Sequence, residues 1–352
     1  MQGELSGGKV VVTATEADIP GYGKEREGLE LSLEEAAFLL DKRKLTILHG
    51  ETELSLEALM VRAQDTMPMF TVRYLVYKDL KERGYAVKAG GVDFWLYPRG
   101  TRQGEKPAMY FIRILSERDF ISLTELDELL ISARNMRKGL ILAVLDDESD
   151  ITYYEVKEPG FGGGIELQST EGKAKASLIG DRVALCDVEF AEKLYNNYFY
   201  GKLTKEKRLL LSLVEAAYLM THNQLDIELA NNDYATMEEF VEYASTIERE
   251  FFDKYTVYAD LRGRGLMLKT GFKFGSHFRG YKAVQQKHSL YLIHVLPRDF
   301  VFSMPGLSRA VRLAHGVKKR MIFAFKCNTQ ASPAEREDEH RIKYVDIGRM
   351  KL

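Results

Sequence analysis

At 352 residues the chain is longer than one average domain and fits two or more. Its 50 Lys and Arg residues nearly balance its 52 Asp and Glu residues, so the net charge of −2 does not favour a nucleic-acid partner, and any such argument depends on local basic positions. The sequence has neither a long uncharged apolar run nor a basic segment followed by an apolar one at its start, so we predict no membrane span and no secretion signal, and expect a cytoplasmic protein.

Comparison of the chain with itself reveals a duplication. Residues 31–40 (LSLEEAAFLL) recur as residues 211–220 (LSLVEAAYLM), an offset of 180. Further matches, at offsets of 180–184, include Tyr74–Leu80 with Tyr255–Leu261, Tyr110–Leu115 with Tyr291–Leu296, and Ala133–Lys138 with Ala314–Lys319. Because the matches spread over more than a hundred residues, we expect two copies of one two-part module rather than a solenoid.

The first half begins with an amphipathic helix, predicted from Leu31 to about Arg43 because its apolar residues are spaced near 3.6. A second helix, around Val72–Arg83, is predicted to end at Gly84 as a C-terminal cap. A strand, a helix and another strand are then expected over Met109–Leu115, Leu123–Asn135 and Leu140–Leu145.

An acidic segment, Asp146-Asp-Glu-Ser-Asp150, separates the strand-like runs Ile141–Leu145 and Ile151–Val156. This pattern predicts a hairpin, and a solvated turn rich in Asp and Ser is its simplest interpretation. The second half carries a longer polar and acidic loop in its place, from Asn328 to Glu339.

Glycine-rich residues from Pro159 to Gly164, followed by a polar stretch to about Ile179, indicate a linker. The second half then repeats the order of the first. Its expected helices cover Leu211 to about Thr221, about Glu248–Arg264 and Pro305–His315, and its expected strands cover Ser289–Leu296 and Met321–Lys326. Pro305 is predicted near the first helical position and Gly316 just past the end of that helix.

Three segments of the second half form a specific pattern: residues 269–281 (KTGFKFGSHFRGY), 288–291 (HSLY) and 308–319 (SRAVRLAHGVKK). In this order they closely resemble the catalytic core of archaeal tRNA-intron endonucleases. Residues 180–217 resemble the N-terminal lobe of the same family, so the resemblance covers essentially the whole chain.

The resemblance implies a catalytic triad of Tyr281, His288 and Lys319. RNA cleaved through its own 2′-OH needs a base for that proton, an acid for the departing 5′-oxygen and a cation for the phosphorane. We therefore expect Tyr281 to act as base, His288 as acid and Lys319 as the stabilising cation. Since the attacking oxygen belongs to the substrate, neither a metal nor a cofactor is expected, and the second half shows no His/Cys/Asp/Glu cluster with ligand spacing.

Each residue of the triad also has an ordinary structural interpretation. Tyr281 is one of 19 tyrosines, and it needs a nearby cation to act as base because a phenol has a pKa of about 10 in water. His288 competes with His277 and His294, one of which could be a hydrogen-bonded interior histidine. Lys319 lies in a basic run of the kind that often enters a strand from solvent. Tyr281 and His288 are seven residues apart, a few fewer than is usual in the family.

The first half serves as an internal control. Tyr97, Pro107 and Lys138 stand at the places of the triad, and Ile131 replaces Arg312. Because proline cannot donate a proton to a leaving group, we expect this half to be catalytically inactive.

The resemblance implies that Arg312 and Arg349 clasp a bulged base between their guanidinium groups. Surface ion pairs are the alternative for both. It also implies that Asp146, Asp147 and Asp150 form an assembly loop, which enters a basic pocket of a second chain in a homodimer. Basic residues near Lys269, Arg279 and Lys318 are candidates for lining that pocket, and Arg279, Lys318 or Lys319 for the cation near Tyr281.

We therefore expect an α+β protein that duplicates a two-lobe module, with four lobes in all. The expected parts are an N-terminal lobe (residues 1–68), an inactive nuclease-like lobe (69–158), a linker (159–178), a second N-terminal lobe (179–247) and a catalytic lobe (248–352). Its expected activity is cleavage of bulge-helix-bulge RNA in precursor tRNA, which leaves 2′,3′-cyclic phosphate and 5′-OH ends. A non-catalytic RNA-binding or scaffold subunit is the rival. Cys186 and Cys327 are expected to be free thiols rather than one disulfide.

Overall fold

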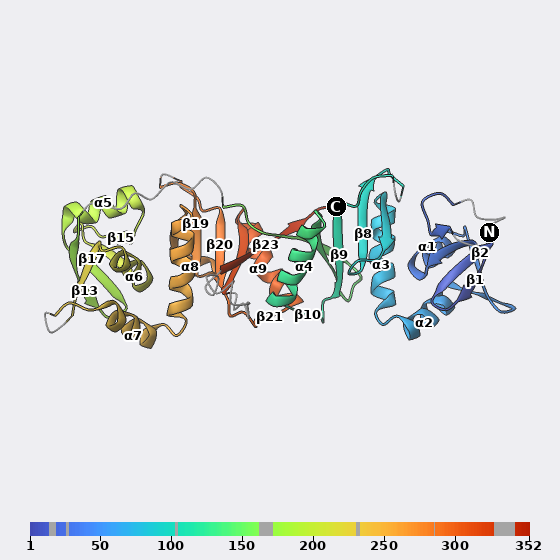
Figure 1. The fold of residues 1–352 in the computed structure, drawn as a ribbon, viewed down its shortest axis with the longest axis horizontal. Coiled ribbons are helices and arrows are strands. Elements are labelled where there is room, and N and C mark those ends of the chain that lie inside the picture. Colours follow the sequence, from blue (N-terminus) through green and yellow to red (C-terminus); the bar gives the residue numbers. More distant parts are fainter. Residues whose placement is uncertain are drawn as a thin grey trace, which may run out of the picture. The chain divides into compact units, whose positions relative to one another are not determined.

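The structure is a computed structural model that describes residues 1–13, 19–25, 28–102, 105–161, 172–229, 233–284, 286–326 and 342–352. Helices and strands are mixed along the chain (Figure 1), which confirms the α+β class. The chain divides into two compact units. The first comprises Met1–Lys157, Val301–Ser308 and Gly348–Leu352, and the second comprises Glu158–Phe300 and Arg309–Ile347.

In the N-terminal lobe of the first unit, a sheet with the strand order β3-β4-β2-β1-β5-β6 packs against two helices. Alternate residues of its strands, such as Val10, Val12 and Leu31, are buried, as expected for a sheet with one face on a core. The elements are β1 (Gln2–Ser6), β2 (Lys9–Thr13), β3 (Lys24–Glu25), β4 (Gly28–Ser32), α1 (Leu33–Asp41), β5 (Thr46–His49), β6 (Thr52–Leu54) and α2 (Leu56–Thr66).

Helix α1 begins with a capping box, in which Ser32 accepts a hydrogen bond from Glu35 N while Glu35 accepts one from Ser32 N. The other carboxylate oxygen of Glu35 accepts from Gly23 N at 3.2 Å, so one buried side chain caps the helix and holds a loop. Such a cap stabilises a helix by about 1 kcal/mol. The second unit repeats the arrangement with Ser212, Glu215 and Gly201.

The C-terminal lobe of the first unit contains a sheet with the order β12-β11-β9-β8-β7. Strands β9 and β11 are parallel, because α4 crosses between them. Gly84, with φ of 85°, follows the end of α3 and confirms the predicted cap. The elements are α3 (Phe70–Glu82), β7 (Tyr85–Ala89), β8 (Phe94–Arg99), β9 (Tyr110–Ser116), β10 (Phe120–Ser122), α4 (Leu123–Asn135), β11 (Gly139–Leu145) and β12 (Ile151–Lys157).

The second unit has its own N-terminal lobe, with the strand order β15-β16-β14-β13-β17. Its first strand pairs in parallel with β17, as β1 does with β5. The elements are β13 (Ala174–Ile179), β14 (Arg182–Leu185), α5 (Val188–Tyr198), β15 (Lys202–Leu203), β16 (Leu209–Ser212), α6 (Leu213–Thr221), β17 (Leu225–Glu228) and α7 (Met237–Ile247).

The C-terminal half of the second unit repeats the order strand, helix, parallel strand, since β20 pairs with β22 across α9. Ile293 pairs with Ile322 as Ile112 pairs with Ile141, so the two halves align at an offset of 181 here. The elements are α8 (Phe251–Gly263), β18 (Met267–Thr270), the 3₁₀ helix η1 (Phe272–Phe274), β19 (Phe278–Tyr281), β20 (Tyr291–Val295), α9 (Met304–Gly316), β22 (Arg320–Lys326) and β23 (Ile342–Met350). The first unit includes β21 (Val301–Ser303), the start of α9 and the end of β23.

The predicted helices and strands are confirmed within about three residues at each end. Helix α9 begins at Met304, so Pro305 is its second residue, near the first position as predicted. One detail was wrong, because the helix includes Gly316 rather than ending before it. Pro305 is tolerated there because amide groups of the first turn have no acceptor within the helix. Ser303 accepts from Gly306 N at 3.3 Å and caps the helix instead.

Some expectations fall outside the described residues, namely the loop from Asn328 to Glu339, Cys327 and much of the expected linker. Strand β13 starts at Ala174, within the linker expected at residues 159–178. Cys186 is an exposed free thiol. Among the described helices none is long and apolar enough to span a membrane.

Candidate active site

Tyr281 lies at the end of β19, which pairs with β18 on one side and β20 on the other. Its buried ring meets the ring of Phe199 edge-on, with centroids 5.1 Å apart. Arg279 is two residues earlier and therefore on the same face of the strand. Its guanidinium carbon is 5.9 Å from the centroid of the Tyr281 ring. The phenol is thus fixed by an aromatic ring of the N-terminal lobe and has a cation beside it.

Lys319 is positioned by the turn that ends α9. Lys319 N donates to Ala314 O at 2.9 Å, and Lys318 takes a left-handed conformation with φ of 56°. This geometry closes the helix and starts β22. The amino group of Lys319 donates to Ser289 O at 3.0 Å. Because Ser289 follows His288 directly, the structure brings the lysine to the segment that carries the histidine.

His288 lies in the loop between β19 and β20, and its side chain is exposed. Leu290 N donates to Gly280 O at 2.9 Å, which ties the end of this loop to the strand of Tyr281. The predicted triad therefore comes from three adjoining places: the end of β19, the loop after it and the start of β22.

Two cations face the ring of Phe274. Lys319 Nζ is 5.5 Å and the Arg279 guanidinium carbon 5.8 Å from its centroid. Within the described residues, neither forms an ion pair with a carboxylate; they bond instead to the main-chain oxygens of Ser289 and Thr270. Partial burial, and then Arg279, lowers the pKa of Lys319. An anion beside both groups would relieve this repulsion, so the arrangement suits a phosphate.

Lys269 is not part of this pair of cations. Its amino group donates to Gly201 O and lies 4.5 Å from the ring centroid of Phe199. Burial lowers the pKa of Lys269 to about 8. Of the basic residues expected to line a pocket, this one is turned into its own unit.

The two histidines that compete with His288, His277 and His294, are partly buried. His277 Nδ1 accepts a hydrogen bond from Val295 N at 2.8 Å, and its ring is 5.5 Å from that of His294. Burial lowers the pKa of His277 to about 4, and burial also lowers the pKa of His294. Both imidazoles are therefore neutral near pH 7. His288 is the exposed histidine of the three, which suits a residue that must reach a leaving group.

The first unit shows what a matching site without the full set looks like. Trp95 pairs with Phe111 as Arg279 pairs with Leu292, so a tryptophan stands at the place of the arginine. Lys138 follows the same helix ending as Lys319, with its N–H donated to Ala133 O at 2.8 Å. Pro107 is exposed and has no acidic proton to donate. The left-handed turn before the lysine is therefore structural, whereas the histidine and the arginine are particular to the second half.

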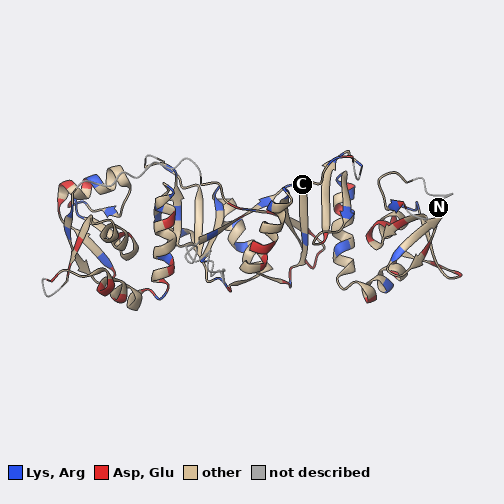
Figure 2. Cartoon of the chain, viewed as in Figure 1, with Lys and Arg blue, Asp and Glu red and all other residues tan. Residues whose placement is uncertain are grey.

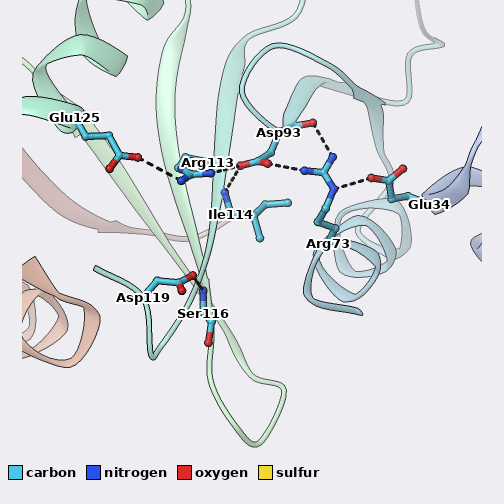
Figure 3. Close-up of polar contacts among 8 residues, drawn as sticks. All are labelled: Glu34, Arg73, Asp93, Arg113, Ile114, Ser116, Asp119 and Glu125. Carbon is cyan, nitrogen blue, oxygen red and sulfur yellow. Dashed lines mark hydrogen bonds and ion pairs between the residues drawn. The ribbon is translucent and has the colours of Figure 1, made fainter. Parts of the chain in front are cut away.

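In place of imidazoles, the first unit has a network of charged side chains (Figure 3). Asp93 accepts from Ile114 N at 2.8 Å and from Arg73 at 2.5 Å, with Arg113 at 3.4 Å. Arg73 also bonds Glu34 at 2.8 Å, and Arg113 bonds Glu125 at 3.3 Å. Glu34 and Asp93 are buried, so each carboxylate is taken from water with a guanidinium as its partner.

Arg312 and Arg349, the two arginines expected to hold a base, are both exposed. Arg312 lies on α9 in the second unit, whereas Arg349 lies near the end of β23, in the segment that belongs to the first unit. Their role stays a prediction.

The predicted acidic hairpin is confirmed as a structure, since β11 and β12 pair up to Leu145 and Ile151. Asp146 Oδ1 accepts from the N–H groups of Glu148 and Asp150, so Asp146 shapes the turn. Asp147 is exposed and bonds Arg118 at 2.6 Å. Neighbouring Glu117 has its pKa raised by desolvation and then by Asp147. Carboxylates are thus crowded at one exposed tip.

The described residues contain no group of three or more His, Cys, Asp or Glu side chains that could hold a metal ion. Lys and Arg are spread over both units rather than gathered in one of them (Figure 2). The local pair of cations at Phe274, and not the overall charge, is what distinguishes the site.

Residues 70–153 and 251–331 match the family model described as tRNA intron endonuclease, catalytic C-terminal domain. Residues 1–60 and 174–241 match the one described as tRNA intron endonuclease, N-terminal domain. Because each domain is matched twice, the duplication predicted from the repeat is confirmed.

The chain is also similar to archaeal proteins named tRNA-splicing endonuclease. It is 42% identical over 361 residues to that of Methanosarcina acetivorans, with 100% of each chain covered. It is 42% identical over 337 residues to that of Methanococcoides burtonii, covering 94% of this chain and 93% of the relative. For Natronomonas pharaonis the identity is 35% over 373 residues, with 99% of each chain covered.

Proposed function

The chain belongs to the tRNA intron endonuclease family, and we propose that it excises introns from precursor tRNA by cleaving bulge-helix-bulge RNA without a metal ion. The observation that carries the chemistry is the pair of cations, Lys319 and Arg279, that lies beside Tyr281 and the His288 segment without a carboxylate partner among the described residues. Negative charge develops on the phosphate during cleavage, and cations that are already held in place stabilise such charge best.

In the proposed reaction the 2′-oxygen of the substrate attacks the neighbouring phosphorus. Tyr281, as phenolate, takes the 2′ proton, and Arg279 stabilises the negative charge of that phenolate. The bond between phosphorus and the 5′-oxygen breaks, and His288 gives its proton to the departing oxygen. Lys319, with Arg279, stabilises the charge on the non-bridging oxygens. The upstream fragment keeps a 2′,3′-cyclic phosphate and the downstream fragment a 5′-OH.

The test is incubation of the purified protein with a bulge-helix-bulge precursor in excess EDTA, followed by identification of the product ends. We expect full activity, with cyclic phosphate and 5′-OH ends. A substrate with a 2′-deoxy nucleotide at the cleavage site should bind and stay uncut. Cleavage of the deoxy substrate at the normal rate, or loss of activity in EDTA, would overturn the mechanism.

The proposed assembly is a homodimer. Each chain supplies one complete catalytic set and one acidic hairpin, so two chains supply two of each, which suits the two intron boundaries. In a two-fold arrangement the hairpin tip with Asp147 and Asp150 of one chain meets a basic pocket in the second half of the other, and symmetry repeats the contact. The exposure of Asp147, Glu148 and Asp150 at that tip supports a cationic partner, which would compete with Arg118 for Asp147.

A non-catalytic scaffold is the second candidate, since the first half alone would be one. What favours it for that half is Pro107 and Trp95 at the places of His288 and Arg279. The second half retains both residues, which supports catalysis by this chain.

A further inference from the structure

The loop that leads into β19 differs between the two halves. In the first unit β7 and β8 are joined by four residues, Gly90–Asp93, and Gly90 N donates to Asp93 O at 3.1 Å. In the second unit β18 and β19 are joined by seven residues, Gly271–His277, and Gly271 N donates to His277 O at 2.9 Å. The same hydrogen bond closes both loops, so the second half carries an insert of three residues.

The insert has a fixed backbone. Its residues form η1, in which Phe274 N donates to Gly271 O at 2.7 Å and Gly275 N to Phe272 O at 3.0 Å. Gly275 has φ of 60°, which glycine adopts without strain. The buried hydroxyl of Ser276 bonds the main chain at both ends of the turn. A short helix held in this way presents its side chains in defined directions.

Phe272 is 86% exposed, more than any other large apolar side chain among the described residues. Its neighbour Phe274 contacts Lys319 and Arg279, the cations proposed to hold the phosphate. The residue between them, Lys273, is also exposed. The turn that brings Phe274 to these cations therefore also carries an exposed aromatic ring and an exposed basic side chain.

Among possible occupants, an unpaired nucleotide fits this combination best. Its base has a flat π face that stacks on an aromatic side chain, and its phosphate is drawn to the cations beside the ring. A peptide segment would match the ring but not the cations unless it were acidic. The insert is confined to the half with the catalytic set, as expected of a feature that serves the substrate.

We propose that Phe272 is a stacking platform for an unpaired RNA base adjacent to the scissile phosphate. This inference rests on the proposed function and names a substrate contact within it. Stacking of this kind is worth roughly 5- to 150-fold in affinity per base.

The experiment measures binding of uncleavable 2′-deoxy bulge-helix-bulge RNA that carries 2-aminopurine at each bulge position in turn. Phe272→Ala should weaken binding about 5- to 150-fold and remove the fluorescence quenching at one bulge position. Phe272→Trp should retain both. The matched control is Phe252→Ala, because Phe252 is also an exposed phenylalanine of the second unit, 55% exposed on α8. It should change binding less than twofold, and a fully paired duplex should not distinguish the variants.

Wild-type affinity and quenching in Phe272→Ala would overturn the inference, even if the protein cleaves its substrate as proposed. So would a change in self-association of Phe272→Ala in sedimentation velocity without a change in quenching, because the ring would then contact a second chain. Conversely, quenching that is lost in Phe272→Ala would still support the stacking role if the wild-type protein proved unable to cleave. Only the proposed activity would then be contradicted.

Discussion

At one equivalent point the two halves use opposite chemistry. Asp93 in the first half accepts a hydrogen bond from Ile114 N on β9, and His277 in the second accepts one from Val295 N on β20, both at 2.8 Å. Around Asp93 the partners are two arginines, whereas around His277 they are His294 and Lys254, with Glu250 at 3.8 Å. Both halves therefore supply an acceptor for this N–H. It is a carboxylate with arginine partners in the first half and a neutral imidazole in the second.

The difference shows what a duplicated fold can vary. The first half lacks counterparts of His288 and Arg279 and has ion pairs that remove Glu34 and Asp93 from water. The second half keeps the cationic site. Its neutral His277 forms no ion pair among the described residues, but the acceptor nitrogen loses its lone pair on protonation. Four expected outcomes, from the largest to the smallest, test this division.

If catalysis belongs to the second half alone, His288→Ala should lower the single-turnover cleavage rate by about 10²- to 10⁴-fold, because the general acid is removed. The matched pair Lys319→Ala and Lys138→Ala sharpens the comparison, since both lysines follow the same helix ending. Lys138→Ala should leave the chemical step almost unchanged. A Lys138→Ala defect as large as that of Lys319→Ala would mean that the active half is wrongly assigned.

Asp93→Ala should destabilise the first half by about 3 kcal/mol, because two partly buried guanidinium groups lose their shared carboxylate. Denaturant unfolding measures the loss, and hydrogen exchange at the amide of Ile114 should speed up. Arg118→Ala removes an exposed ion pair with Asp147 and serves as control, with an expected change below about 1 kcal/mol. Equal effects of the two variants would contradict the importance given to the network.

The second half should be the more sensitive to acid. His277 has a pKa of about 4 in the folded state against 6.5 when unfolded, so the unfolded state binds more protons below pH 6.5. The stability that depends on neutral His277 is present above pH 6.5 and is lost as the pH falls towards 4, by up to about 3 kcal/mol.

His277→Asn keeps an acceptor for Val295 N and removes the titration. The unfolding free energies of the wild type and this variant are measured from pH 7 to pH 4.5. As the pH falls, the wild type should lose more stability than the variant. A difference that stays constant over this range would show that protonation of His277 does not cause the loss of stability in acid.

The smallest expected effect concerns the hairpin. Asp147→Lys with Asp150→Lys should raise the dissociation constant of self-association at least about tenfold and lower cleavage in parallel, although both residues lie in the half that is expected to be inactive. Asp146 is left intact because it shapes the turn. Sedimentation velocity with cleavage assays measures both. A wild-type monomer that cuts both boundaries, or a variant with unchanged association and activity, would contradict the assembly.

Much of this architecture could be predicted from the sequence because it is local or repeated. The helix expected from Leu31 to about Arg43 follows from its apolar spacing, and the repeat at an offset of 180 transfers this expectation to the second half. Its exact start at Leu33 depends on the cap at Ser32. The turn between β11 and β12 follows from its Asp-rich composition.

Contacts between distant residues could not be predicted in this way. Nothing local to Phe274 indicates that Lys319 and Arg279 meet at its ring, and the Asp93 network joins four elements. One signal was present: the offset between the halves rises from 181 at Gly271 to 184 at Phe278, which marks the three-residue insert.

The first unit is built from segments that lie far apart in the sequence, and this has a consequence for synthesis of the chain on the ribosome. Residues 348–352 belong to that unit, Met350 and Leu352 pack on its core, and Arg83 bonds Leu352 O at 3.1 Å across 269 residues of sequence. At a translation rate of roughly 5–20 residues per second, the partner of Arg83 emerges about 10 to 50 seconds later. The unit whose synthesis begins first therefore receives its last residues only after the second unit has been translated.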